Sequence, residues 1–239
     1  MQSHFAAPPI LWCFTICIML WCPCVSSQVT PGVFDRIYKT KFWGPEGDGS
    51  GPGSTVQVTA FLRRLLERFI EENNVTTIVD APCGSFHWIP LLIQSLLLKT
   101  HYVTYTGIDI VQGEINRLQK EWPNDRWPNI SFRHADITKD PLPQNVDLIL
   151  SRDALQHLSE ENVKKALTNY KLANPRFLIL GGYLETRNLN IADGGYFSFS
   201  PLQPPYSLLP KYIMYERMDP ESRKHLFVFD RLSMQSWNF

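Results

Sequence analysis

Three aspartates follow consecutive short runs of apolar and β-branched residues. Asp80 ends TIVD, Asp109 ends YTGID, and Asp136 follows ISFRHA. If these runs are strands of one parallel sheet, their carboxyl ends lie at the same edge, which is where such sheets bind ligands. The three carboxylates would then lie near one ligand and would suit a cationic one. A simpler interpretation stays open for two of them, because Asp80 could cap the following helix and Asp136 could be a turn residue.

The turn after the first of these runs, Pro82-Cys83-Gly84, contains a single glycine. A dinucleotide pyrophosphate prefers several glycines and a free helix N-terminus, because backbone amides must approach its anionic oxygens. An adenosyl ligand without phosphates needs one tight bend and an acidic group for its ribose hydroxyls. The turn therefore favours an adenosyl ligand. Cys83 is expected to be a packed thiol, since no arrangement of cysteine, histidine and acid accompanies it.

The stretch SRDALQHLS, residues 151–159, could carry proton transfer. If a helix begins near Asp153, then Asp153 and His157 are four residues apart and lie on one face. Together they could remove a proton from a hydroxyl acceptor. A structural interpretation remains open, in which Asp153 caps the helix and His157 packs on the sheet or pairs with Glu160 or Glu161.

The elements that would position these residues alternate along the chain. Strands are expected at Thr77–Ala81, Val103–Ile108, Ile130–His134, Val146–Leu150 and Phe177–Leu180, with helices near 86–98, 111–121 and 159–173. This alternation predicts a parallel sheet with helices on both faces. Two later runs, Lys211–Glu216 and His225–Phe229, predict an antiparallel closing hairpin with Met218–Ser222 between them. The expected fold is therefore α/β: a Rossmann-like, doubly wound, three-layer αβα sheet that is mostly parallel, with an antiparallel C-terminal strand.

The segment before the first strand divides into two parts. Its first part, WGPEGDGSGPGS at 43–54, is rich in glycine and proline and predicts a loop, either a linker or a lid over a ligand. After Ser54 and Thr55, which are good N-caps, residues 56–70 predict an amphipathic helix. A long aromatic and proline-rich connection, 196–206, is expected after the fifth strand in place of a crossover helix, and function often lies in such connections.

These motifs, in this order, resemble the class I methyltransferases that use S-adenosylmethionine. VDAPCG is similar to that family's first motif, GIDI to its ribose-binding motif, HADI to its adenine motif, and VDLILSRDALQHLS to its fourth strand and following helix. DAPCG-x-x-x-W with the upstream W-G and S-G-x-G-S looks like a little-characterised methyltransferase group, with Ser85 where an acid is expected. The resemblance implies S-adenosylmethionine as cofactor, no metal, and the following cofactor-binding residues: Asp80, Ala81, Gly84, Asp109, Ile110, Asp136, Ile137, Ser151 and Arg152.

The N-terminus predicts entry into the secretory pathway. Residues 10–22 are apolar except for Thr15 and are followed by small residues, which is typical of a signal peptide over residues 1–27; a short uncleaved membrane anchor is the alternative. Four of the five cysteines lie in this leader, so no disulfide framework is expected. Sequons at Asn74 and Asn129 could be glycosylated. Residues 28–54 are expected to form a loop or lid, and residues 55–239 the methyltransferase-like domain.

Charge and compartment narrow the expected function. The 23 basic and 23 acidic residues balance, so no nucleic-acid partner is implied, and a membrane is expected only if the leader is retained. The sequence predicts a lumenal or secreted methyltransferase acting on a hydroxylated acceptor, either a glycan or a small molecule, with Asp153 and His157 as catalytic residues. The alternatives are a secreted binding protein without catalysis and, less favoured by the glycine-poor turn, a nicotinamide dehydrogenase.

Overall fold

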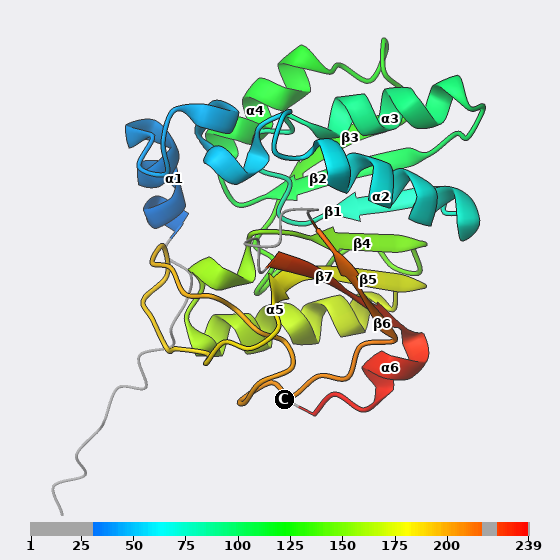
Figure 1. The fold of residues 1–239 in the computed structure, drawn as a ribbon. Helices are drawn as coiled ribbons and strands as arrows, with labels where there is room; N and C mark the ends of the chain where they lie inside the picture. Colours follow the sequence, from blue (N-terminus) through cyan, green and yellow to red (C-terminus); the bar gives the residue numbers. More distant parts are fainter. Residues whose placement is uncertain (1–30, 217–223, 239) are drawn as a thin grey trace, which may run out of the picture.

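A computed structural model describes residues 31–216 and 224–238. The described residues form a seven-stranded sheet in the order β3-β2-β1-β4-β5-β7-β6 (Figure 1). Strands β1 to β5 run parallel to one another, and β7 pairs antiparallel with β5 and β6. The strands are β1 (Thr77–Asp80), β2 (Thr104–Asp109), β3 (Ile130–His134), β4 (Leu148–Ser151), β5 (Phe177–Tyr183), β6 (Tyr212–Tyr215) and β7 (Lys224–Asp230). The predicted Rossmann-like sheet with an antiparallel C-terminal strand is confirmed.

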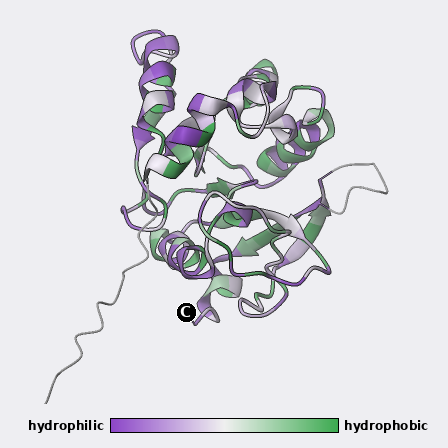
Figure 2. Ribbon diagram, turned by 90° about the vertical axis from the view of Figure 1, so that its left-hand side faces the viewer, coloured by the Kyte–Doolittle hydropathy of each residue, from purple (hydrophilic) through white to green (hydrophobic). Residues whose placement is uncertain are grey.

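Helices cover both faces of this sheet. α2 (Ala60–Glu72), α3 (Ile89–Leu98) and α4 (Gln112–Glu121) share one apolar cluster with alternate strand residues such as Ile78. α5 (Glu160–Ala173) and α1 (Pro31–Thr40) share the other cluster with residues such as Val79. α6 (Arg231–Gln235) follows β7 directly. Purple and green alternate along the helices in Figure 2, as expected for helices with one polar and one apolar face.

Two predictions upstream of β1 were wrong in detail. Residues 31–40, predicted as part of a loop or lid, form α1, whose Phe34 and Ile37 are buried. The glycine-rich part holds two short 3₁₀ turns, Glu46–Gly49 and Pro52–Ser54. α2 begins at Ala60 rather than at residue 56, and residues 56–59 form a turn that Thr59 closes by donating from its backbone N and its Oγ1 to the carbonyl of Thr55.

The predicted leader, residues 1–27, lies outside the described residues, and so does the predicted hairpin connection at 218–222. Within the described ranges, no helix combines the length and the apolar character needed to cross a bilayer.

Candidate active site

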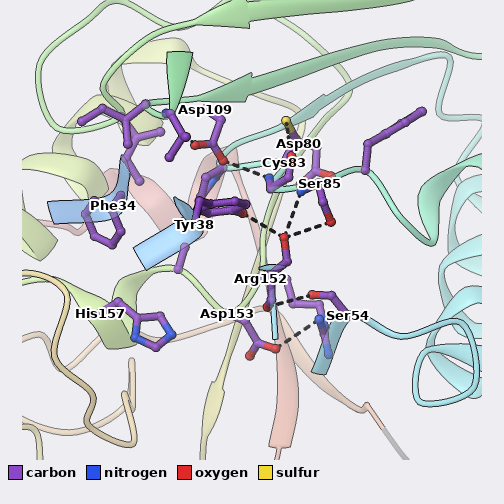
Figure 3. A pocket seen from close by; sticks show the side chains of 18 of the residues that line it. Phe34, Tyr38, Ser54, Asp80, Cys83, Ser85, Asp109, Arg152, Asp153 and His157 are labelled. Atoms are coloured by element: carbon purple, nitrogen blue, oxygen red, sulfur yellow. Dashed lines mark hydrogen bonds and ion pairs between the residues drawn. The ribbon is translucent and has the colours of Figure 1, made fainter. Parts of the chain in front are cut away.

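A pocket of about 930 Å³, counting the part open to solvent, lies at the carboxyl ends of β1, β2 and β4. Strand-end residues form its floor, and α1 and the glycine-rich segment cover it (Figure 3). The predicted site residues that line it are Asp80, Gly84, Asp109, Ile110, Asp136, Ile137, Arg152, Asp153 and His157. The structure therefore brings together residues that lie up to 77 positions apart in the sequence.

Two predicted residues lie beside the pocket without lining it. Ala81 is fully buried, and its carbonyl accepts a hydrogen bond from Tyr170 Oη at 2.8 Å. Ser151 Oγ bonds the same hydroxyl at 2.9 Å. The Ala81 carbonyl and the Ser151 hydroxyl thus hold Tyr170 of α5 at the ends of β1 and β4. The predicted contact of these two residues with the cofactor stays a prediction.

Asp80 and Asp109 are buried carboxyls at the ends of β1 and β2. Burial raises the pKa of Asp80 to about 7, although the hydroxyl of Tyr105 donates to its Oδ2 at 2.9 Å and acts in the opposite direction. Burial also raises the pKa of Asp109 to about 6, against the backbone amides of Val111 and Gly84, which donate to its two oxygens at 2.9 Å. A cationic ligand nearby would stabilise the ionised form of both carboxyl groups.

Gly84 makes the close approach that the sequence indicated. Its φ is +55°, and a Cβ at this position would lie 2.7 Å from Ser50 Oγ and 3.1 Å from the hydroxyl of Tyr38. The pocket also holds Asp136, whose Oδ1 accepts bonds from Thr138 N and Oγ1. Asp136 is therefore both a turn residue and a pocket residue, so the two interpretations of it are compatible.

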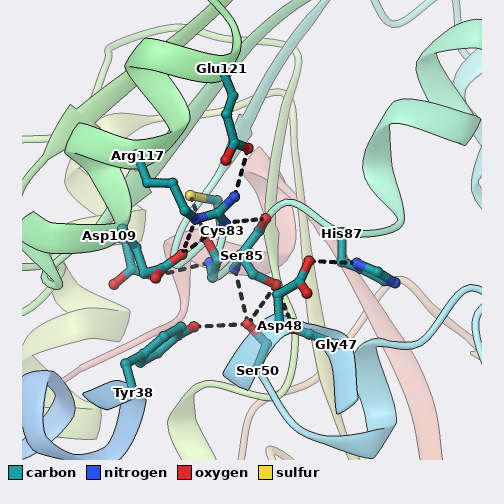
Figure 4. Close-up of polar contacts among 12 residues, drawn as sticks. Tyr38, Gly47, Asp48, Ser50, Cys83, Ser85, His87, Asp109, Arg117 and Glu121 are labelled. Carbon is teal, nitrogen blue, oxygen red and sulfur yellow. Dashed lines mark hydrogen bonds and ion pairs between the residues drawn. The ribbon is translucent and has the colours of Figure 1, made fainter. Parts of the chain in front are cut away.

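A hydroxyl network joins the glycine-rich segment to the Gly84 turn (Figure 4). Ser50 Oγ accepts from Ser85 N at 2.9 Å and donates to Ser85 Oγ at 3.0 Å. Ser85 Oγ donates in turn to the carbonyl of Gly47 at 2.6 Å, and Tyr38 Oη bonds Ser50 Oγ at 2.8 Å. Asp48 Oδ2 contacts His87 Nδ1 at 2.8 Å. Ser85 stands where an acid was expected. Its hydroxyl donates a hydrogen bond to the carbonyl of Gly47, which an ionised carboxylate could not do.

A second buried network lies at the end of β4. Nε of Arg152 donates to Glu216 Oε1 at 3.0 Å, and its Nη2 donates to the carbonyl of Gly53 at 3.0 Å. Arg152 Nη1 lies 3.1 Å from Asp153 Oδ2, while Lys224 Nζ donates to Asp153 Oδ1 at 2.6 Å. Burial opposes ionisation of Asp153, but Arg152 and Lys224 together lower its pKa to about 2. The two acids and two bases therefore neutralise one another.

The predicted relation between Asp153 and His157 was wrong. Asp153 has a φ of +54°, and only a 3₁₀ turn, Leu155–His157, precedes α5. The two residues do not share a helix, and the carboxylate of Asp153 is bound by Lys224 and Arg152. His157 Nδ1 instead lies 2.7 Å from the carbonyl of Gly195, which fixes the imidazole. Burial lowers the pKa of His157 below its ordinary value, so the ring is neutral at pH 7.

The pocket contains residues that sequence reasoning missed. Most are aromatic or hydroxyl side chains: Phe34, Tyr38, Trp43, Ser50, Ser54 and Trp88. Trp43, Ser50, Ser54 and Trp88 belong to the W-G, S-G-x-G-S and DAPCG-x-x-x-W motifs, which were the available signal, but no site role was predicted for them. Phe34 and Tyr38 lie outside every quoted motif. The Cys83 thiol also lines the pocket, and burial raises its pKa well above the ordinary value, as expected for a packed thiol. Among the described residues, no group of three or more His, Cys, Asp or Glu side chains could hold a metal ion.

Comparison with known families gives one match within the chain. A family model described as a methyltransferase domain matches residues 78–173, which run from the second residue of β1 to the end of α5. No curated protein sequence matches the chain.

Several solved structures share the fold. The structure of PigF with SAH aligns with this chain at a TM-score of 0.56 and 15% identity, and the alignment covers 83% of this chain and 62% of PigF. The methyltransferase domain of bacterial CtHen1-CN aligns over its whole length with 74% of this chain, with a TM-score of 0.54 and 15% identity. An S-adenosylmethionine-dependent methyltransferase from Clostridium acetobutylicum gives a TM-score of 0.52 and 10% identity over 72% of this chain and 91% of its own. The similarity to the structure of the citrinin polyketide synthase CMeT domain covers 52% of this chain and 35% of that one, so this chain spans about a third of that structure's length.

Proposed function

We propose that this chain is a class I S-adenosylmethionine-dependent methyltransferase that transfers a methyl group to a hydroxylated small molecule or glycan in the secretory pathway. The match of residues 78–173 to a methyltransferase-domain model supports the methyl transfer. The observation that supports methyl transfer is that one pocket is lined by Asp80, Gly84, Asp109 and His157. Bound there, S-adenosylmethionine supplies an electrophilic methyl group on a sulfonium. The task of the chain is to hold it, align the acceptor and take the proton of the acceptor.

The residues of the pocket fit this cofactor. Buried carboxyls suit its positive charge, and we propose that Asp109, at the end of β2, accepts bonds from ribose hydroxyls with the lone pairs that the amides of Gly84 and Val111 leave open. Gly84, with a φ of +55°, supplies the tight bend that an adenosyl ligand requires after β1, and Ser50 and Tyr38 pack against it. Asp136 and Ile137, at the end of β3, are proposed to contact the adenine.

Cofactor choice can be tested by thermal stability. S-adenosylmethionine and its demethylated product should each raise the melting temperature of the protein, whereas NAD should not, because the turn offers too few free amides for a pyrophosphate. Stabilisation by NAD alone would contradict the proposed function. If none of these ligands stabilises the protein, the binding-protein alternative would be favoured.

Replacing Asp109 by alanine should weaken S-adenosylmethionine binding by about 1.5–3 kcal/mol, the range for hydrogen bonds to a charged group. The variant should also lose stability, because Asp109 holds the amides of Gly84 and Val111. Calorimetric titration of the folded fraction checks this, with the exposed Asp125→Ala as a control. Unchanged affinity would remove Asp109 from the site.

Cofactor affinity should also depend on pH. Burial raises the pKa of Asp80 to about 7 and that of Asp109 to about 6, and a cationic ligand favours their ionised forms. Binding therefore releases protons, and affinity should rise between about pH 5 and pH 8. The same titration repeated over this range tests the dependence.

The compartment is part of the proposal. The apolar leader predicts a mature protein that starts near Gln28, and the sequons predict glycan on Asn74 or Asn129. Both asparagines are exposed, and Asn74 lies in a turn with a φ of +47°. The Asn129 side chain donates to the carbonyl of Val103 at 3.1 Å, so Asn74 is the more accessible of the two.

Protein from a eukaryotic secretory host should therefore lose its first ~27 residues, as the length of a signal peptide implies. Its gel mobility should increase after glycosidase treatment, and Asn74→Gln should remove most of that change. Sequencing of the N-terminus decides the first point. An intact Met1 on an unglycosylated protein would contradict the proposed compartment.

A further inference from the structure

The pocket has a second end, which lies away from Asp109 and is walled by aromatic rings. Figure 3 shows Tyr38 between the Asp109 end and the end that carries Asp153 and His157. The ring of Trp43 lies over the imidazole of His157, with centroids 4.5 Å apart and planes 32° apart. Tyr196 continues this series outward, 5.8 Å from His157 and 56% exposed. Ring faces of this kind favour a ligand that can stack on them.

The charged side chains at this end of the pocket pair with one another, so none of them offers an unpaired charge to an acceptor. Lys224 binds Asp153, and Arg152 binds both Asp153 and Glu216. A charged acceptor would have to break one of these contacts or stay unpaired in a buried site, and either event is costly. The second end therefore favours an uncharged acceptor.

The imidazole of His157 is set to accept a proton. The carbonyl of Gly195 can only accept, so Nδ1 carries the hydrogen of the neutral ring and Nε2 carries the lone pair. With this tautomer, the side-chain amide of Gln156 donates a long hydrogen bond of 3.4 Å to Nε2, which an acceptor hydroxyl would replace. Burial and three neighbouring groups affect the pKa of His157: burial lowers it, Gly195 and Asp153 raise it, and Lys224 lowers it, with a net decrease.

A base of this strength selects among hydroxyls. A phenol has a pKa of about 10, whereas an aliphatic hydroxyl resembles water at about 16. The difference of about six pKa units makes phenolate formation by the same imidazole roughly a millionfold more favourable. An acidic hydroxyl is therefore matched to His157, and an ordinary sugar hydroxyl is not.

Size is a further restriction. The pocket of about 930 Å³ includes space open to solvent, so its enclosed part is smaller than this volume, and it must hold both cofactor and acceptor. A small acceptor is therefore favoured.

On the basis of the proposed function, we propose that the acceptor is an uncharged phenol with one aromatic ring, which packs against Trp43 and presents its hydroxyl to Nε2 of His157. The phenol proton passes to Nε2, and the phenolate oxygen bonds to the methyl carbon. The carbon–sulfur bond breaks, and its electron pair goes to sulfur. The products are an aryl methyl ether, S-adenosylhomocysteine and an imidazolium that returns its proton to water.

The test compares 4-methylphenol with 4-methylcyclohexanol, which has similar size but no aromatic ring and no acidic hydroxyl. Each is titrated by calorimetry into protein saturated with S-adenosylhomocysteine. The phenol should bind about three- to tenfold more tightly, the range expected for one aromatic contact. Equal binding, tighter binding of the cyclohexanol, or no measurable binding of the phenol would overturn the proposal.

Variants of Trp43 test whether this residue causes the preference for the phenol over the cyclohexanol. Trp43→Leu should reduce it to less than about twofold, and Trp43→Phe should keep most of it, because a ring remains. Trp127→Leu is the control, since that ring packs on Trp122 and does not line the pocket. A preference that survives Trp43→Leu would also overturn the proposal. Binding of S-adenosylhomocysteine is measured first: its failure counts against the proposed function, whereas its success without phenol selectivity counts against this inference alone.

Discussion

Replacing His157 by alanine should lower turnover by about 10²–10⁴-fold, the usual effect of removing a positioned general base. Affinity for S-adenosylmethionine should change little, because the carboxyls at the other end of the pocket are untouched. The Gly195 carbonyl fixes the tautomer whose Nε2 can accept a proton. The measurement is turnover per folded molecule, with the folded fraction determined by titration with S-adenosylhomocysteine.

The dependence on pH gives a second test of His157. The neutral ring is the active form and burial lowers its pKa, so the rate should rise through a midpoint below about 6.5 and stay level at neutral pH. His101→Ala serves as the control, because His101 bonds the carbonyl of Val75 away from the pocket. A packing role predicts another result, in which His157→Ala lowers stability by a few kcal/mol and spares the rate of the folded molecules.

Much of the fold was readable because its signals are local. Short β-branched runs such as TIVD and LILS gave the strands, and the acids that follow them gave the edge at which the pocket lies. This works because parallel strands place all their carboxyl ends together. The cofactor end of the pocket was therefore predictable from Asp80, Gly84 and Asp109.

The remainder of the site depends on contacts between distant segments. α1 is a ten-residue helix next to a glycine-rich stretch, and only its packing on the sheet edge makes it stable. The sequence suggested that Asp153 and His157 share a helix, but the backbone turns at Asp153 toward Lys224, which lies 71 positions away. A partner so distant in the sequence leaves no periodic signal. The sequence therefore could not show that the carbonyl of Gly195, and not Asp153, orients the imidazole of His157.

The buried array around Arg152 leads to the largest expected effect on stability. Glu216→Ala should lower the free energy of unfolding by about 3–5 kcal/mol, because it leaves the guanidinium of Arg152 buried with one carboxylate partner fewer. For a chain of this size that corresponds to a decrease in melting temperature of roughly 6–20 °C. Glu216→Gln should cost less, since its amide oxygen can still accept from Nε of Arg152.

The control is Glu72→Ala, which removes the exposed pair Arg68–Glu72 and should leave the stability nearly unchanged. The pH dependence supplies an independent check. Asp153 belongs to the same array, and its pKa of about 2 lies below the usual unfolded value of about 4. Its stabilising effect is therefore complete above pH 4 and disappears as the pH falls toward 2. If Glu216→Ala costs no more than Glu72→Ala, water must reach Arg152, and the array would then contribute little to holding Gly53 and the glycine-rich segment over the pocket.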